Sequence, residues 1–546
     1  MGGIIGKLSF DRHVTIAHAT VRRMIDAVAH RAAAGANRSR AMYVGRGIAL
    51  GCCDQSAAAV SQVALNETGT VRAVADSDLS NAVSLRCVLQ DRGHLVRGST
   101  DAELIAHAYE EWGDACVERF AGPFACAVWD EIRRRLFLAR DPFGVRPLCF
   151  AFHGRGLVFG SETTPLLQDP SVGREWQPQA IDAYLALGYV PAPFTIYRRI
   201  SKLEAGQALV VDGRRLTTRC YSDVSDDECS HAGERERIDL AESSLRASVA
   251  SFTDQPDACV LMSGGLASTA VAAMLPCGGT SVTVGIEQDP SDLDRVFRIA
   301  ALLGLHSEID IAVPDAADIV RQVACHFDEP AADPAAVSQY AVFAAARRYT
   351  DTALTGHGAA PLCDRPHTRR LFDEAMRNQL YTRRFAWQVL EGQAVALSNG
   401  DAYNSLPDSQ LALADRTASA AGLRLRHPFL DRSLTATPTA VLRQIAARHL
   451  PASLLPPARG TAPDPRWLSQ AVQSLVPQVL LGDRIDTRGI FSRPALQMLW
   501  QEHQRGAHDH THRLWSLLML EFWIREFIDG DAAAEPAEHA VLVRAA

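Results

Sequence analysis

The stretch from residue 258 to residue 275 reads ACVLMSGGLASTAVAAML and combines three local patterns. Its first five residues are apolar, as expected of a buried β-strand, and the run from Thr269 onwards predicts the first turns of a helix. The turn between them is rich in serine and glycine. Backbone N–H groups in such a turn, at the start of a helix, are well placed to bind phosphate. The stretch therefore predicts a strand–turn–helix unit with a phosphate-binding loop.

The surrounding sequence predicts a parallel β-sheet covered by helices. Expected helices and strands alternate along the chain: a helix at 240–249, a strand at 258–262, a strand at 281–286, a helix at 292–303 and a strand that contains 353–354. Such alternation is typical of a parallel sheet with helices on both faces. Residues 370–530 are expected to be mostly helical, and the Ala-rich residues 531–546 to form a flexible tail.

The first 215 or so residues have a different pattern, in which turns separate short strands. The expected strands are 125–129, 135–139, 157–159 and 208–211. Asp141-Pro142-Phe143-Gly144 is a strong turn signal. Thr100, followed by a carboxylate at Glu103 and an apolar run, predicts a capped helix N-terminus. Residues 222–237 are polar and charged, and are the expected linker between the two halves.

Composition narrows the classes of protein to consider. A chain of 546 residues is too long for one hydrophobic core, so two or more domains are expected. The net charge of -8 argues against nucleic acid or an anionic membrane as a main partner. The 12 cysteines are scattered without a C-x-x-C pattern, and no signal peptide is visible, which favours a reducing, cytoplasmic location. No apolar run is long enough for a membrane span.

Several motifs together resemble those of glutamine-dependent asparagine synthetases. Residues 140–148, RDPFGVRPL, resemble the family's R-D-x-x-G-x-x-P-L turn, and residues 120–125 and 160–162 match it in order and spacing. The loop at 263–268 resembles the family's S-G-G-x-D-S. Residues 355–361 and 425–431 resemble its S-G-E-G-A-D-E and R-x-P-F-L-D segments. The chain up to about residue 528 is therefore similar to the asparagine synthetase superfamily.

The resemblance implies a fold and a domain organisation. The expected fold is an α+β N-terminal nucleophile-type layered sandwich, followed by an α/β adenine-nucleotide hydrolase-like parallel-sheet domain with helical additions. The expected domains are residues 1–221, glutaminase-like, and residues 238–530, the ATP-binding domain, with residues 531–546 as a tail.

The resemblance also implies that the glutaminase chemistry is lost. The family uses a cysteine directly after the initiator methionine, whose thiolate attacks the amide of glutamine. Gly2 stands at that position here. The family's N-G-E triplet aligns with Asp76-Ser77-Asp78, so that Arg31 and Asp101 alone remain of the residues that would bind glutamine. This half is expected to be structural, or to bind something else.

In the second half, the resemblance implies an ATP site. The pyrophosphate would be cradled by Ser263, Gly264, Gly265 and Ser268, and the adenine site lined by Leu261, Val284 and Gly356. The family holds Mg²⁺ with an aspartate in each of two loops, but Ala267 and Ala360 stand there. The family also uses a late lysine to stabilise charge in the transition state. No lysine follows Lys202, and Arg459 is a candidate to replace it.

Three explanations fit the two alanines. The chain is a natural pseudoenzyme, or a deliberate Asp→Ala double variant, or it binds the metal with other carboxylates. The candidates for such replacement ligands are Asp328, Glu329, Asp333 and Asp364. Glu329 and Asp333 each precede a proline, so turn roles are expected for them.

These observations lead to three functional hypotheses. The leading one is an ATP-dependent ligase that forms an amide through an acyl-adenylate, specifically a lasso-peptide macrolactam cyclase, which needs no ammonia. Its partners would be a peptide or small-molecule carboxylate and, in addition, a leader-peptide-binding protein and a protease. The alternatives are a non-catalytic scaffold that binds nucleotide or peptide, and an ammonia-dependent asparagine synthetase.

Two further groups of residues have a functional and a structural interpretation. The run His508-Asp509-His510-Thr511-His512, with His503 upstream, could bind metal but is expected to be a solvent loop before a helix. The late tryptophans are expected to belong to the core, at positions 467, 500, 515 and 523.

Overall fold

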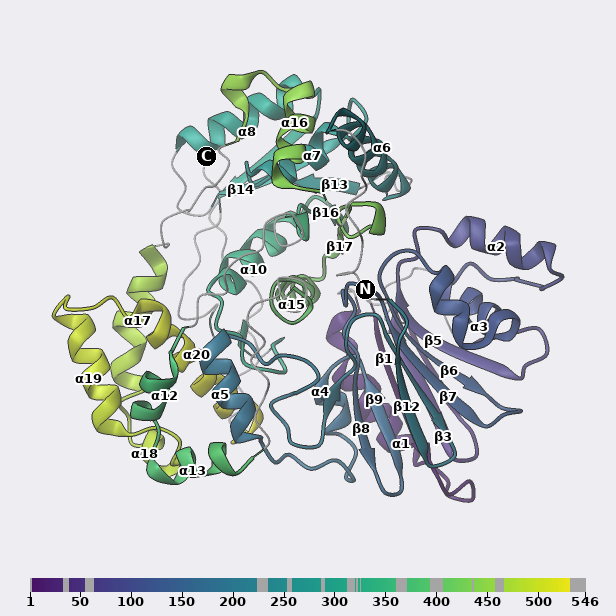
Figure 1. Cartoon of the computed structure of the whole chain (residues 1–546), viewed down its shortest axis with the longest axis horizontal. Helices are drawn as coiled ribbons and strands as arrows, with labels where there is room; N and C mark the ends of the chain where they lie inside the picture. The colour runs from purple at the N-terminus through teal and green to yellow at the C-terminus, as the bar shows by residue number, and fades with distance from the viewer. Residues whose placement is uncertain are drawn as a thin grey trace. The chain divides into compact units, whose positions relative to one another are not determined.

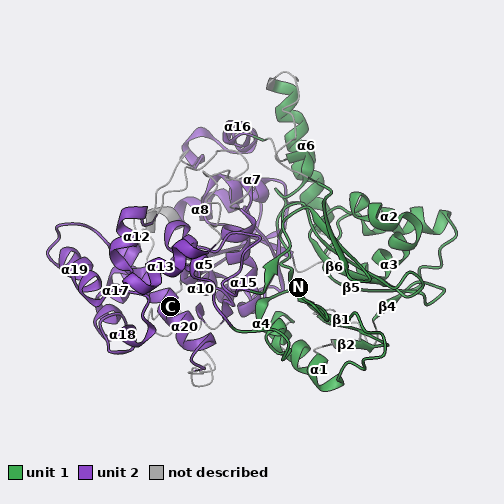
Figure 2. Cartoon of the chain, turned by 60° about the horizontal axis from the view of Figure 1, so that its bottom comes forward, with its two compact units in different colours: residues 1–174, 199–256, 427–437 green, residues 175–198, 257–426, 438–546 purple. Residues whose placement is uncertain are grey.

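The computed structural model describes residues 2–32, 39–54, 63–222, 234–252, 258–285, 290–311, 320, 323–324, 326–359, 371–392, 406–434, 437–456 and 466–530. The chain divides into two compact units, each drawn from several segments (Figure 2). Unit 1 comprises residues 1–174, 199–256 and 427–437, and unit 2 comprises residues 175–198, 257–426 and 438–546. Within the described residues, no helix has the length and apolar character that crossing a bilayer would require.

Unit 1 is built on two antiparallel six-stranded sheets (Figure 1). The first sheet has the strand order β10 (Ser201–Lys202), β8 (Cys149–His153), β9 (Gly156–Gly160), β1 (Gly3–Ser9), β3 (Ile48–Asp54) and β2 (Ser39–Val44). The second has the order β12 (Arg215–Cys220), β11 (Gln207–Asp212), β7 (Arg135–Arg140), β6 (Phe124–Asp130), β5 (Val71–Ser77) and β4 (Ala64–Leu65). The expected strands of this half are thus confirmed.

Strand β6 shows why the two sheets stack. All of its residues are buried, and they alternate between two hydrophobic clusters. Ala127 and Trp129 pack with residues of the first sheet, whereas Cys126 and Val128 pack with the helices α2 (Ala82–Asp91) and α3 (Asp101–Trp112). Helix α1 (His18–Ala27) covers the other side, against β1 and β3. Unit 1 is therefore the layered α+β sandwich that the sequence predicts.

Of the two hydrogen bonds of the predicted capping box at the start of α3, the one to the Thr100 hydroxyl forms. The hydroxyl of Thr100 accepts a hydrogen bond of 3.3 Å from the amide of Glu103. The carboxylate of Glu103 instead accepts from the amide of Arg97, at 2.8 Å. The cap therefore fastens the incoming loop as well as the first turn of the helix.

The remaining helical elements of unit 1 are η1 (Ala29–Arg31), η2 (Gly113–Arg119), α4 (Thr163–Leu166), α6 (Glu234–Phe252) and η5 (Arg432–Leu434). Helix α6 begins inside the stretch that was expected to be a linker, and residues 223–233 lie outside the described residues.

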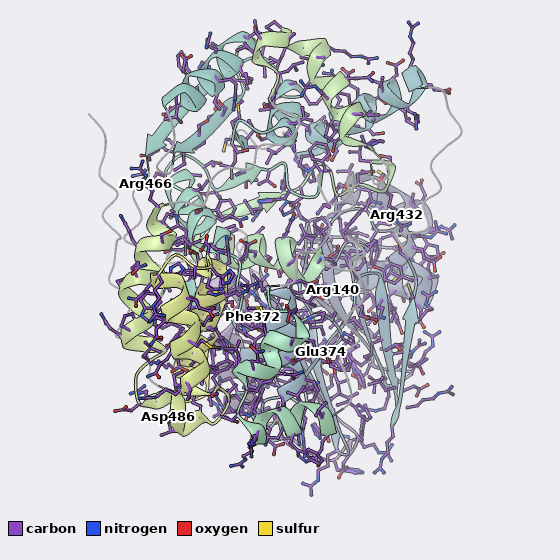
Figure 3. The ribbon with its side chains drawn as sticks, turned by 60° about the vertical axis from the view of Figure 1, so that its left-hand side comes forward. Arg140, Phe372, Glu374, Arg432, Arg466 and Asp486 are labelled. Atoms are coloured by element: carbon purple, nitrogen blue, oxygen red, sulfur yellow. The ribbon has the colours of Figure 1, made fainter. Side chains whose placement is uncertain are left out.

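The RDPFGVRPL motif is a buried turn that is fixed by its own charged side chains. Arg140 is labelled in Figure 3. Its guanidinium donates to the carbonyls of Arg146 at 2.8 Å, Leu203 at 2.7 Å and Gly144 at 2.7 Å. The carboxylate of Asp141 accepts from three amides of the same turn, those of Phe143, Val145 and Arg146. Both side chains are almost fully buried. Their hydrogen bonds satisfy backbone groups that no strand or helix would otherwise pair.

Unit 2 contains a parallel five-stranded sheet. Its order is β15 (His306–Ile311), β14 (Thr280–Gly285), β13 (Ala258–Leu261), β16 (Thr352–Leu354) and β17 (Arg424–Arg426). Helices α7 (Leu266–Ala273), α8 (Pro290–Leu302) and α16 (Thr439–His449) lie on one side, and α10 (Ala335–Ala346) and α15 (Ala412–Ala421) on the other (Figure 1). The predicted parallel sheet with helices on both faces is confirmed.

The rest of unit 2 is helical, as expected. It contains α5 (Pro178–Leu187), α12 (Glu374–Leu380), α13 (Arg383–Glu391), η4 (Pro407–Leu411), η6 (Ala452–Leu454), α17 (Arg466–Val479), α18 (Arg484–Arg488), α19 (Arg493–Gln504) and α20 (Thr511–Phe527). The four late tryptophans are buried, as predicted, and Trp467 stacks edge-on against Trp515.

Only part of the histidine run forms the predicted loop: residues 508–510 precede α20, whereas Thr511 and His512 lie in its first turn. His510 is buried, and its Nε2 atom lies 3.0 Å from a carboxylate oxygen of Glu502.

Replacing Arg140 with alanine should destabilise unit 1. The change leaves three buried carbonyls without donors, at a cost of about 3 kcal/mol or more. We expect a thermal unfolding midpoint several degrees lower than that of the wild type. Arg298→Ala is the control, because Arg298 and its ion-pair partner Asp294 are both exposed, and its loss should have little effect. Equal midpoints for the two variants would contradict the assignment.

Candidate functional site

The serine- and glycine-rich turn is where the sheet of unit 2 meets its first helix. Strand β13 ends at Leu261, and α7 begins at Leu266. Gly264 adopts a φ of 76°, and a Cβ there would lie 2.9 Å from the side chain of Val296. Only glycine fits this position without strain. The predicted strand–turn–helix unit is therefore present.

Two serine hydroxyls hold the turn in place. The Oγ of Ser268 lies 3.1 Å from the Oγ of Ser263 and donates to the carbonyl of Gly265, also at 3.1 Å. It accepts from the amide of Ser263 at 3.3 Å. The first N–H groups of a helix have no partner within the helix, so the start of α7 offers donors to an anion. The turn thus leads directly into the start of α7, as the sequence prediction of a phosphate-binding loop requires.

A second loop meets this turn. Gly356 follows β16, the neighbour of β13 in the sheet. A Cβ on Gly356 would lie 2.8 Å from both the Cβ of Ala267 and the amide nitrogen of Ser268. The backbone of the second loop therefore lies directly against the first turn of α7. The structure brings the predicted residues Gly356 and Ala267 together, whereas Ala360 lies outside the described residues.

The strand order explains why these two loops form a site. From β13 the chain moves to β14 and β15 on one side of the sheet, and then to β16 and β17 on the other. The chain continues from β13 to the strands on one side of the sheet and from β16 to the strand on the other, and such a reversal of strand order is where open α/β sheets bind ligands. Leu261 ends β13, and Val284 is the penultimate residue of the adjacent β14. The predicted phosphate and adenine residues thus occupy the carboxyl ends of the central strands.

An arginine that the sequence did not point to, Arg295, lies beside this loop. Arg295 lies on α8, and its guanidinium is 3.4 Å from the position that a Cβ of Gly264 would take. A guanidinium next to a phosphate cradle adds positive charge where an anion would sit. The sequence shows an arginine on a predicted helix, but not that this turn of the helix packs on the loop.

The carboxylates considered as replacement metal ligands have other partners. Asp328 is buried and pairs with Arg416 at 2.7 Å. Glu329 accepts from the amide of Ile196 at 2.8 Å, and Asp333 accepts from the amide of Ala335 at 2.9 Å. Asp364 and the candidate cation Arg459 lie outside the described residues.

His357 stands in the second loop, where the resembling family has a glutamate. Its Nδ1 atom lies 3.1 Å from the hydroxyl of Thr355. Burial lowers the pKa of His357 to about 4, so its imidazole is neutral at physiological pH. This loop therefore presents a neutral polar group where a carboxylate would bring negative charge.

The other candidate site lies at the start of the chain, in unit 1. Gly2 is buried, its amide donates to a carboxylate oxygen of Asp76 at 3.0 Å, and its carbonyl accepts from Arg31 at 2.8 Å. Arg31 is fully buried and also pairs with Asp76 at 3.2 Å and Glu162 at 2.9 Å. Arg146 lies 3.6 Å from Asp76. Buried charges of both signs thus surround the position where the resembling family has its nucleophile.

The surviving Asp101 has a structural contact. Its carboxylate accepts from the amide of Leu79 at 2.9 Å, which ties the start of α3 to the loop after β5.

A thiol near Gly2, that of Cys53, is not activated as a nucleophile. Cys53 pairs with Gly3 in the register of β1 and β3, and its thiol donates to the carbonyl of Val28 at 3.3 Å. Burial raises the pKa of this thiol to about 12. The reactive form of cysteine is the thiolate, which burial disfavours here. Cys53 is therefore expected to be inert at neutral pH.

Comparisons with known proteins match both halves of the chain. Residues 1–222 match the glutamine amidotransferase domain family, and residues 240–399 and 401–525 match the asparagine synthase family. A putative glutamine-hydrolyzing asparagine synthetase of Mycobacterium tuberculosis is 26% identical, over 85% of this chain and 86% of that protein. The glutamine-hydrolyzing asparagine synthetase 1 of Bacillus subtilis is 23% identical, over 84% of this chain and 86% of that protein.

Among solved structures, glutamine phosphoribosylpyrophosphate amidotransferase from B. subtilis aligns with 83% of this chain and 94% of its own, at 12% identity and a TM-score of 0.31.

The reactivity of Cys53 can be tested directly. Because its thiol is buried and protonated, iodoacetamide should leave Cys53 unmodified in the folded protein at mildly alkaline pH. The exposed Cys87 and Cys277 should react and serve as internal controls. Peptide mass spectrometry reads out each site. Modification of Cys53 at a rate comparable to Cys87 would show that a reactive thiol stands beside Gly2 after all.

Proposed function

Because the chain belongs to the asparagine synthase family, we propose that it is an ATP-dependent, amide-forming ligase of the lasso-peptide macrolactam cyclase type. Its amine would come from the substrate itself rather than from glutamine. The proposal is carried by two features of the same chain. Unit 2 keeps the serine- and glycine-rich turn, whereas unit 1 has a glycine where the glutaminase nucleophile would stand.

The proposed reaction has two steps. A substrate carboxylate attacks the α-phosphorus of ATP, which gives an acyl-adenylate and releases pyrophosphate. An amine of the same peptide then attacks the acyl carbon, which forms the amide, releases AMP and gives up one proton. The turn at Ser263–Ser268 and the start of α7 would bind the phosphates of ATP, and Arg295 would add positive charge beside them.

ATP fits the residues of this site, but Mg²⁺ does not. A magnesium ion needs hard oxygen ligands, usually carboxylates, close to the phosphates. The methyl group of Ala267 provides none, and Asp328 and Glu329 are engaged elsewhere. We therefore expect slow turnover, because a lost ligand of this kind costs on the order of 10²-fold or more in rate.

Unit 1 would have a structural role in this proposal. Arg31 forms ion pairs with Asp76 and Glu162 next to Gly2. Such a network needs no bound amide to balance its charges. A free peptide substrate, a leader-peptide-binding protein and a protease are the proposed partners, and the cytoplasm the proposed location.

The second candidate is a non-catalytic scaffold that binds nucleotide or peptide. It is favoured by the same Ala267, together with the absence of any lysine after Lys202. The two proposals agree on ATP binding and differ on whether a bond is formed.

Pyrophosphate exchange separates these proposals. The wild type and the double variant Ala267→Asp/Ala360→Asp are incubated with ATP, Mg²⁺, labelled pyrophosphate and peptides translated from short reading frames next to the gene. We expect exchange and a peptide product lighter by one water in the double variant, at a rate roughly 10²-fold or more above the wild type. The Gly173→Ala protein is a control, because a methyl group there contacts nothing.

Other outcomes would overturn the ligase proposal in distinct ways. An asparagine synthetase would be identified if pyrophosphate exchange required free aspartate and if an amide product formed only when ammonia or glutamine was added. ATP binding without exchange in either protein, with every peptide, would identify the scaffold.

A further inference from the structure

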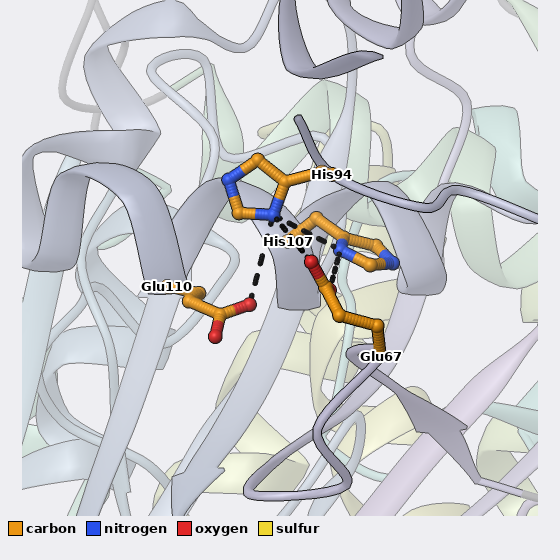
Figure 4. Close-up of side chains that lie close together, drawn as sticks. All are labelled: Glu67, His94, His107 and Glu110. Atoms are coloured by element: carbon orange, nitrogen blue, oxygen red, sulfur yellow. Dashed lines mark hydrogen bonds and ion pairs between the residues drawn. The ribbon is translucent and has the colours of Figure 1, made fainter. Parts of the chain in front are cut away.

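A cluster of four potential metal ligands lies in unit 1, apart from both sites described above. Glu67, His94, His107 and Glu110 each direct one nitrogen or oxygen atom to a common point (Figure 4). These atoms all lie within 4.8 Å of one another. Of the residues that the structure describes, no other group of histidine, cysteine and carboxylate side chains converges in this way.

Three separate segments supply the four residues. Glu67 lies in the turn between β4 and β5, and His94 lies in the connection from α2 to α3. His107 and Glu110 are three residues apart on α3, so they share one face of that helix. A metal ion at this point would fasten the turn and the connection to α3.

The distances suit a small tetrahedral cation. The two Nδ1 atoms of His94 and His107 are 3.4 Å apart. The carboxylate oxygens of Glu67 lie 3.3 Å from His94 Nδ1 and 2.8 Å from His107 Nδ1, and a Glu110 oxygen lies 3.6 Å from His94 Nδ1. Bonds of about 2.0–2.2 Å to a tetrahedral ion place neighbouring ligand atoms about 3.3–3.6 Å apart. The separations of 3.3, 3.4 and 3.6 Å fall within that range, whereas the 2.8 Å contact to His107 is made by the second carboxylate oxygen of Glu67.

The surroundings hold the ligands in position. His94 directs its second nitrogen, Nε2, to the carboxylate of Glu111 at 3.2 Å. A carboxylate behind a metal-binding histidine is the usual arrangement, because it leaves the lone pair of the other nitrogen facing the metal. The turn that carries Glu67 is fixed by Asn66, whose side-chain oxygen accepts from the amides of Thr70 and Val71, both at 2.9 Å. His107 is almost fully buried.

We propose that Glu67, His94, His107 and Glu110 bind one divalent transition-metal ion of the zinc class. Two imidazole nitrogens with two carboxylates favour such an ion over Mg²⁺ or Ca²⁺, which prefer oxygen ligands alone. All four positions are filled by the protein, so the role is structural: the ion joins the β4–β5 turn, the α2–α3 connection and α3. The inference is independent of the ligase activity.

The test uses the untagged full-length protein, stripped of metal with a chelator and titrated with Co²⁺. Tetrahedral Co²⁺ with nitrogen ligands gives intense visible absorption bands, which report the geometry as well as the affinity. We expect these bands to appear, to saturate at one ion per chain, and to vanish when Zn²⁺ displaces Co²⁺. The thermal unfolding midpoint should rise when Zn²⁺ is added.

Variants connect the signal to the four residues. Glu67→Gln and Glu110→Gln change side chains near the surface, so folding should be retained, and each should weaken Co²⁺ binding at least tenfold. His94→Gln should abolish the bands. Glu111→Gln, which alters only the residue behind His94, should weaken binding about 10–100-fold. His13→Ala is the control, because this exposed histidine lies outside the cluster, and it should bind Co²⁺ like the wild type.

Two results would overturn the proposal. One is a folded wild-type protein, verified by circular dichroism, that gives no tetrahedral Co²⁺ bands and no Zn²⁺-dependent rise in its unfolding midpoint. The cluster would then be a hydrogen-bonded network. The other is Co²⁺ binding that is unchanged in the folded Glu67→Gln and Glu110→Gln proteins, which would place the ion elsewhere.

Discussion

The ATP-binding half of this protein depends on how closely two loop backbones approach each other. Gly356 lies so near the first turn of α7 that even a methyl group would come within 2.8 Å of Ala267 and Ser268. This approach is possible because β13 and β16 are adjacent parallel strands, and because the strand order reverses between them. It brings the start of a helix, two serine hydroxyls and a neutral histidine to one place. The residue at position 267 therefore faces the second loop, where an aspartate would be well placed to hold a cation and alanine cannot.

The fold of the first half does not depend on a bound substrate. The antiparallel sheets, the helices on them and the Arg140–Asp141 turn are held by burial and by hydrogen bonds that involve no substrate. Gly2 has no side chain that could act as a nucleophile, and its backbone is fixed by Asp76 and Arg31. Removing one partner of such a buried network leaves an unpaired charge, at a cost of about 3–5 kcal/mol. We therefore expect the ionic contacts around Gly2 to stabilise unit 1, whether or not this unit binds glutamine.

Local patterns predicted much of this structure, because they depend on neighbours in the sequence. The strand at 258–262, the turn after it and the cap at Thr100 are of this kind. Contacts between distant segments were out of reach. Residues 175–198 belong to unit 2, Arg295 packs on the phosphate turn, and Glu67 meets His94 and His107 across separate elements. The sequence drew attention to the histidines near residue 510 because they are close in the chain, whereas the convergent ligands are spread over more than forty residues.

In the proposed function, the junction of the two loops binds ATP even without the metal-holding carboxylates. Equilibrium binding of ATP to the wild type and to the Gly356→Ala protein, by isothermal titration calorimetry, tests it most directly. We expect the wild type and a Gly173→Ala control to bind ATP alike. We expect Gly356→Ala to weaken binding at least tenfold, since the added methyl group pushes the second loop away from α7. Equal affinity in all three proteins, or no binding in the wild type, would contradict it.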